Sequence, residues 1–121
     1  MSICLFFPWL ESMKPDIYQA RCLETWHSEQ FDTHWQRIHA TLGIVGEAGE
    51  LSELLKKDQF KPGHESDRKQ RLNELGDVFY YLCILAYLDG CTIDELSELN
   101  HAKLRGGHGW QPDHINDIID L

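Results

Sequence analysis

Apolar residues recur along this chain at helical spacing, whereas alternation of apolar and polar residues with a period of two is nearly absent. The pattern indicates an all-α fold, a bundle of four to five helices. Four helices are predicted, and the last residues of the chain are expected to add a short fifth one. The predicted ranges are residues 15–28, 34–57, 66–89 and 92–104.

The helix boundaries are predicted from residues that satisfy or interrupt backbone hydrogen bonds. Pro62 and Gly63 interrupt the chain between the second and third helices, and Gly90 ends the third. Polar side chains before a helix accept hydrogen bonds from its free N–H groups. The predicted caps are Thr33 in a capping box with Gln36, Ser66, and Thr92 in a capping box with Glu95.

The length of 121 residues predicts one folded domain, which we assign to residues 15–121. Residues 1–14 are interpreted as an N-terminal extension or arm. Their apolar stretch contains Pro8, is too short to cross a membrane and lacks a basic leader. We therefore expect no membrane partner.

The net charge of -9, from 20 acidic and 11 basic residues, argues against a nucleic-acid partner, which would favour a basic surface. The charge is compatible with metal cations, and equally with a merely soluble acidic surface. The four cysteines form no CxxC pair and suggest no disulfide framework, so a reducing, cytoplasmic location is expected.

Carboxylates occupy unexpected positions in two of the predicted helices. In "GIVGEAGELSELLKK", residues 43–57, Glu47 lies in the middle of the apolar face and Glu50 lies at its edge. In the third helix Glu74 again lies within the apolar stripe, and Asp77 lies about 60° from Glu74 around the helix axis. Each pair is spaced i, i+3, which places both carboxylates on one face.

A helical hairpin would bring the two pairs together. Glu50 is about seven residues before the end of its helix, and Glu74 is about eight after the start of the next, so they are level within ~1.5 Å. Uncompensated carboxylates in a partly buried seam are costly, which favours a bound cation. Oxygen ligands prefer Mg²⁺, Mn²⁺ or Ca²⁺ over zinc. A water-filled groove, or pairing with Lys or Arg, remains the alternative.

The segments "GEAGELSEL" and "NELGDVFYYL" resemble the MazG-like all-α nucleoside triphosphate pyrophosphohydrolases, especially the dCTP pyrophosphatase branch, and the related dimeric dUTPases. The resemblance covers about residues 15–110. The ExxE and ExxD motifs of that family fall on Glu47, Glu50, Glu74 and Asp77. A third stretch, "LNHAKLRGGHGW", resembles a family segment that contacts substrate phosphates; Asn100 and Lys103 match, and the arginine is displaced to Arg105.

The resemblance implies hydrolysis of a (deoxy)nucleoside triphosphate such as dCTP to the monophosphate and pyrophosphate, in nucleotide-pool control or house-cleaning. It implies that the four acids hold Mg²⁺, for which Mn²⁺ could substitute. Either Glu47 or Glu50 would act as general base. The family also implies a homodimer or a dimer of dimers.

The remaining candidate residues would bind the substrate. Lys103 with Asn100, and Lys56 or Arg105, would hold the phosphate tail. The base needs an aromatic slot, for which Tyr81 is the best candidate because it shares a helix face with Glu74. Phe31 is a second candidate, since the family places a base-contacting aromatic before the ExxE helix. Core packing is the alternative interpretation of both aromatics.

Two other functions remain open at this point. The chain could be a non-catalytic helical regulatory or interaction module with a vestigial metal site. It could also be a related hydrolase that acts on a modified nucleotide, an alarmone or dUTP, because base selection depends on a few side chains.

Overall fold

The computed structural model describes residues 13–106 and shows an all-helical chain, as the sequence predicts. No strand occurs in this range. The predicted N-terminal arm, apart from Met13 and Lys14, and the expected C-terminal helix lie outside the described residues. The four helices are α1 (Pro15–Glu24), α2 (Thr33–Phe60), α3 (Arg68–Leu88) and α4 (Ile93–Gly106).

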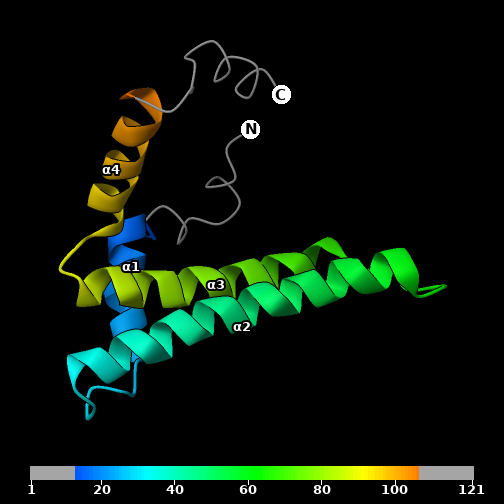
Figure 1. Ribbon diagram of the computed structural model, residues 1–121, viewed down its shortest axis with the longest axis horizontal. Coiled ribbons are helices and arrows are strands. Elements are labelled where there is room, and N and C mark those ends of the chain that lie inside the picture. The colour runs from blue at the N-terminus through cyan, green and yellow to red at the C-terminus, as the bar shows by residue number, and fades with distance from the viewer. Residues whose placement is uncertain (1–12, 107–121) are drawn as a thin grey trace.

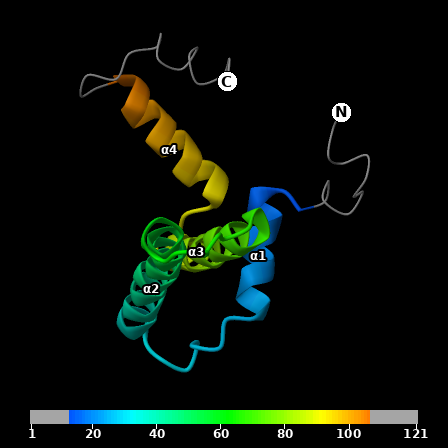
Figure 2. The ribbon, with the colours of Figure 1, turned by 90° about the vertical axis from the view of Figure 1, so that its right-hand side faces the viewer.

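The long helices α2 and α3 form an antiparallel hairpin and lie side by side along the longest axis of the molecule (Figure 1). Helix α1 crosses one end of α3, and Figure 2 shows α3 between α1 and α2. Helix α4 packs against α1 and α3 and is bent by 93° from α3. It therefore extends away from the hairpin (Figure 1).

Two of the three predicted helix caps are wrong, each by one residue. Asp32, not Thr33, caps α2 by accepting a hydrogen bond from the Trp35 N–H at 3.0 Å. Asp67, not Ser66, caps α3. In both places two polar residues stand side by side, and the acid, with its charged oxygens, takes the position that faces the helix N-terminus.

The capping box of α3 is complete, because Gln70 returns a hydrogen bond to the Asp67 N–H. At α4 the predicted cap is confirmed as far as its first hydrogen bond: the hydroxyl of Thr92 accepts from the Glu95 N–H at 3.1 Å. Gly90 follows α3 with a φ of 72°, a conformation that favours glycine.

The hydrophobic core lies at one end of the hairpin, where all four helices meet. Helix α1 ends at Glu24, before the predicted Ser28, and the chain beyond it buries the Trp26 side chain. Gln19 fastens α1 to the start of α4, donating to the Cys83 and Cys91 carbonyls and accepting from the Ile93 N–H. The buried apolar residues are Cys22, Trp26, Ala40, Cys83, Ile84, Ala86 and Ile93.

No single helix within residues 13–106 is both long enough and apolar enough to cross a membrane; α3 and α4 meet these two conditions only when they are taken together, as a pair bent by 93°. The three cysteines in the described range, Cys22, Cys83 and Cys91, are free thiols.

Candidate metal centre and aromatic pocket

The register of the α2–α3 hairpin is fixed at two levels. Near the core, the Tyr81 ring packs against Gly43, and at the hairpin tip Ser66 bonds Asp58. Four residues separate Gly43 from Glu47, and four separate Asp77 from Tyr81. Glu47 is therefore level with Asp77 along the axis of the hairpin. Three residues farther toward the hairpin tip on each helix, Glu50 is level with Glu74, as predicted from the sequence.

Three of the four predicted acids converge in this seam. Glu47, Glu74 and Asp77 each offer a carboxylate oxygen, and these oxygens lie within 4.8 Å of one another. Glu47 and Glu74 are half-buried, and Asp77 is exposed. We call these three residues the acid cluster. Glu50 is exposed and its carboxylate does not belong to the cluster.

The described part of the chain provides no cation for the acid cluster. The lysines of α2 nearest to it, Lys56 and Lys57, pair instead with Glu53. No ion pair within residues 13–106 involves a cluster residue. Desolvation, followed by the negative charges of Asp77, Glu74 and Glu50, raises the pKa of Glu47. The like charges are therefore uncompensated by side chains.

The acid cluster fits a divalent cation that prefers oxygen. Mg²⁺ binds oxygens at about 2.0–2.1 Å, so opposite ligands are about 4 Å apart, and Ca²⁺, at about 2.3–2.6 Å, separates them by about 5 Å. The three carboxylate oxygens lie within 4.8 Å of one another, which is close enough for them to share one such ion.

Tyr81 links the acid cluster to a row of rings. Burial, with the nearby charge of Glu47, raises the pKa of Tyr81. Its ring centroid lies 6.1 Å from that of His39 and 5.2 Å from that of Tyr80. His39 in turn lies 4.7 Å from the Trp26 ring. The predicted base-binding residue Tyr81 thus lies between the acids and an aromatic surface.

An open pocket of about 440 Å³ adjoins this row at the N-terminal part of α2. Its lining includes Phe31, the second aromatic predicted to contact a base, and Trp35; these two side chains are 53% and 58% exposed. His39 lines the pocket and precedes Glu47 by eight residues, or about 12 Å along the helix. We call the pocket at the N-terminal part of α2 the aromatic pocket. It is lined by Phe31, Trp35, Ile38, His39 and Leu42.

The three residues of α4 that were predicted to hold the phosphate tail are not brought to the acid cluster of the same chain. Lys103 lies ten residues into α4, about 15 Å along a helix nearly perpendicular to α3. Asp77 is eleven residues before the end of α3, about 16 Å along its axis, so the two are about 20 Å or more apart. Asn100 and Arg105 share α4, and Lys56 pairs with Glu53 at 3.8 Å.

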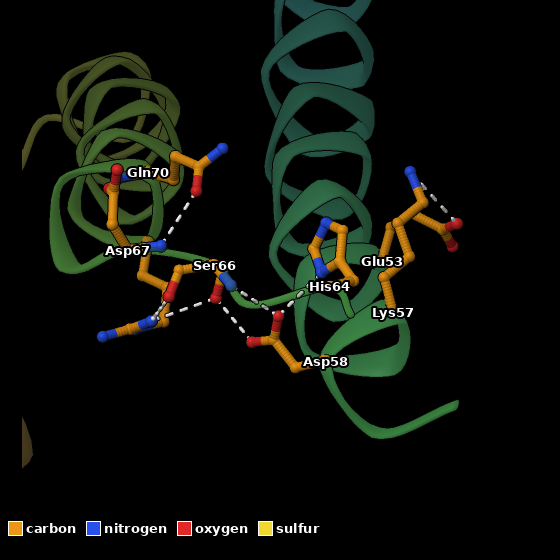
Figure 3. Close-up of polar contacts among 8 residues, drawn as sticks. Glu53, Lys57, Asp58, His64, Ser66, Asp67 and Gln70 are labelled. Carbon is orange, nitrogen blue, oxygen red and sulfur yellow. Dashed lines mark hydrogen bonds and ion pairs between the residues drawn. The ribbon is translucent and has the colours of Figure 1, made fainter. Parts of the chain in front are cut away.

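A polar network at the hairpin tip was not predicted from the sequence (Figure 3). Asp58 accepts hydrogen bonds from the Ser66 N–H at 2.6 Å and from the Ser66 hydroxyl, and His64 Nδ1 lies 2.9 Å from its carboxylate. Arg71 donates to the Ser66 carbonyl at 2.6 Å. The Ser66 hydroxyl is what chiefly lowers the pKa of Asp58.

This network holds the hairpin together and is not a nucleophilic triad. Ser66 is buried, and its hydroxyl bonds the carboxylate of Asp58, whereas a serine nucleophile would bond the imidazole. Asp58 and His64 flank the Pro62–Gly63 break in the sequence, the one signal that could have predicted their meeting.

Comparison with known proteins identifies a relative of this chain whose name describes no activity. No known family model and no solved structure matches the chain. The chain is 36% identical over 76 residues to the Gene 37 protein of Mycobacterium phage L5, a match that covers 56% of this chain and 67% of the phage protein. The chain belongs to the family of this phage protein. Its name describes no activity, so an activity has to be argued from the residues of the chain itself.

Proposed function

We propose that the protein is a Mg²⁺-dependent nucleoside triphosphate pyrophosphohydrolase that converts a (deoxy)nucleoside triphosphate and water to the monophosphate and pyrophosphate. The observation that carries this proposal is the acid cluster, in which three carboxylates from two helices converge without a compensating cation in the described residues. The resemblance to the MazG-like enzymes supplies the reaction.

Glu47, Glu74 and Asp77 would hold the cation, with Mn²⁺ as a substitute. When bound, the cation would neutralise charge on the phosphate oxygens and lower the pKa of water. Glu50 is level with Glu74 but outside the cluster, so its carboxylate is free to accept the proton of the attacking water. We therefore assign the general base to Glu50, with Glu47 as the alternative.

The distance between the aromatic pocket and the acid cluster suits a nucleotide. A base stacked on Phe31 and Trp35 would leave about 12 Å between His39 and Glu47 for the sugar and phosphates. Tyr81 would lie beside the sugar. This arrangement would place both predicted base-binding aromatics, Phe31 and Tyr81, along one substrate.

We propose that the chain self-associates, as a homodimer or a dimer of dimers. Leu42 and Val45 on α2 are 65% and 64% exposed. Beside them, a Cβ added at Gly46 or Gly49 would meet nothing within 4 Å, so a helix of a second copy could approach closely. A second copy could also bring Asn100, Lys103 and Arg105 to the phosphates, which the same chain cannot.

The direct test is incubation with a panel of nucleotides and Mg²⁺, with pyrophosphate as the product measured. The panel contains dCTP, dUTP, dGTP, dATP, an alarmone and nucleotides with methylated or oxidised bases. We expect release of pyrophosphate from a deoxynucleotide such as dCTP, abolished by EDTA, in keeping with a cytoplasmic role in pool control or house-cleaning. No pyrophosphate from any of them would overturn the proposal.

The exposed apolar face of α2 favours one alternative, a non-catalytic helical interaction module with a vestigial metal site. Large exposed apolar side chains gather where a partner helix could cover them. That alternative predicts no pyrophosphate release and no loss of function in a Glu50→Gln variant. It does not explain why three acids converge on the inner side of the hairpin.

A further inference from the structure

We propose that His39, held in place by Ser28, is the residue that distinguishes one base from another, and in particular a 4-amino from a 4-oxo pyrimidine. This inference rests on the proposed function and specifies its substrate. His39 would be a specificity-determining residue that touches the base, and Ser28 a positioning residue that acts through it.

The walls of the aromatic pocket offer few polar atoms. Phe31, Ile38 and Leu42 have none in their side chains. The other two lining residues are Trp35, whose indole N–H can only donate, and His39. Among the residues that the structure describes, a base in this pocket therefore meets side-chain hydrogen-bonding groups at two positions, and His39 is the one that is able to accept.

The His39 ring is fixed from two sides. Its Nδ1 lies 2.7 Å from the hydroxyl of Ser28, a buried residue that is 5% exposed. The ring lies 4.7 Å from that of Trp26, which is itself held by a 2.8 Å hydrogen bond from its Nε1 to Gln36. With Nδ1 engaged, Nε2 is the polar atom that His39 has left for a ligand.

Trp35 differs from His39 in how it is held. Its ring meets that of the adjacent His34 edge-on, with 5.7 Å between the ring centroids, and its side chain is more than half exposed. A ring in that position suits stacking, which every base accepts because every base has a π-face. Trp35 would therefore contribute to affinity for all bases, and the fixed edge of His39 would contribute to the choice between them.

The chemistry of the neutral imidazole makes this choice sharp. When Nδ1 accepts a hydrogen bond from Ser28, Nε2 carries the proton and donates; when Nδ1 donates to Ser28, Nε2 accepts. Cytosine presents an amino donor at C4 and an acceptor at N3, whereas uracil presents a carbonyl acceptor at C4 and a donor at N3. At the C4 position, therefore, an Nε2 that accepts pairs with the amino group of cytosine and not with the carbonyl of uracil, and an Nε2 that donates does the reverse.

The experiment compares kcat/KM for dCTP and for dUTP in the wild type and in three variants. His39→Phe keeps a flat ring but removes the polar edge, and we expect the ratio of the two values to move toward one by about tenfold, the worth of one hydrogen bond. Ser28→Ala should move it in the same direction by a smaller factor. Trp35→Phe, the matched control, should lower both values alike and leave the ratio within about twofold.

Three outcomes would overturn the inference. One is a wild type that cleaves dCTP and dUTP equally well. Another is a His39→Phe variant that melts like the wild type and keeps its preference. The third is a Trp35→Phe variant that loses the preference while His39→Phe retains it. If the wild type releases pyrophosphate from no nucleotide, the proposed function fails, a result distinct from all three.

Discussion

The Tyr81 ring lies so close to Gly43 that a Cβ at that position would overlap three of its carbons. Glycine is required here because a ring of α3 packs on the backbone of α2, one turn before Glu47. Gly43→Ala should therefore push the ring, and with it α3, away from α2. We expect a loss of about 1–3 kcal/mol in the free energy of unfolding, measured by denaturant titration.

Gly76→Ala provides the matched control. Gly76 also lies inside a helix of the hairpin, but a Cβ there would meet nothing within 4 Å. Alanine should stabilise this position by about 0.5–1 kcal/mol. Equal stability of the two variants would contradict the close packing of Tyr81 on Gly43.

Glu74→Gln tests whether the acid cluster binds a cation. The substitution removes one of three clustered negative charges with little change in shape, so the variant should melt at or above the wild-type temperature in EDTA. A cation that binds the folded chain raises the melting temperature with concentration, and the variant should gain less from Mg²⁺ or Mn²⁺. Pyrophosphohydrolase activity should be lost.

A structural role for Glu74 would give the reverse pattern. The variant would melt lower than the wild type in EDTA, and added cation would change neither protein. That pattern would leave both the cation site and the enzyme built on it without support.

Glu47 should make the stability of the metal-free protein depend on pH. Its pKa is raised from an ordinary 4.5, so the folded chain holds the proton more tightly than the unfolded chain does. This stabilisation is complete below the unfolded pKa and is lost as pH rises through the folded one. In EDTA, Glu47→Gln should therefore gain melting temperature relative to the wild type as pH rises from the unfolded pKa of 4.5 through the higher folded pKa. A difference between the two proteins that does not change with pH would contradict the raised pKa.

Glu50→Gln separates proton transfer from cation binding. If Glu50 is the general base, kcat should fall by about 10²–10⁴-fold while Mg²⁺ still raises the melting temperature as it does in the wild type. Glu47→Gln, the comparison, should weaken both. Retained kcat in Glu50→Gln together with lost kcat in Glu47→Gln would assign the base to Glu47.

Asp58→Asn tests the polar network at the hairpin tip. The carboxylate accepts two hydrogen bonds from Ser66, and an amide accepts them less well, so the melting temperature should fall by several degrees. Because the pKa of Asp58 is lowered, its contribution is present above the unfolded pKa and is lost as pH falls through the folded one. Glu53→Gln, which breaks only surface ion pairs on the same helix, should change little.

Periodicity predicted the helices and the level of the acids because both depend on the backbone alone. Once Glu50 and Glu74 lie on facing helices joined by a short turn, their heights follow from the rise per residue. Which acids converge depends on side-chain direction. Glu47, Glu74 and Asp77 turn toward one another, whereas Glu50, one turn along from Glu47, stays in solvent.

The direction of α4 could not be predicted, because no periodicity specifies how a helix leaves a turn. Here Gln19 and Gly90 define the bend. Gly90 predicted where α3 ends, but neither residue predicted the direction in which α4 leaves. The prediction for Lys103 assumed that sequence motifs of one chain share one site. Likewise, Asp32 and Thr33 are both good caps by composition, and only geometry selects between them.

The hydrophobic core occupies one end of the hairpin, and between residues 41 and 82 Ser66 is the only buried residue. The outer half of α2 and α3 therefore has little to prevent it from opening locally while the rest stays folded, and its amides should exchange with solvent sooner. The acid cluster lies at the boundary between these halves. A cation bound there would link α2 to α3. Adding the cation should therefore slow hydrogen exchange at the amides of the outer half.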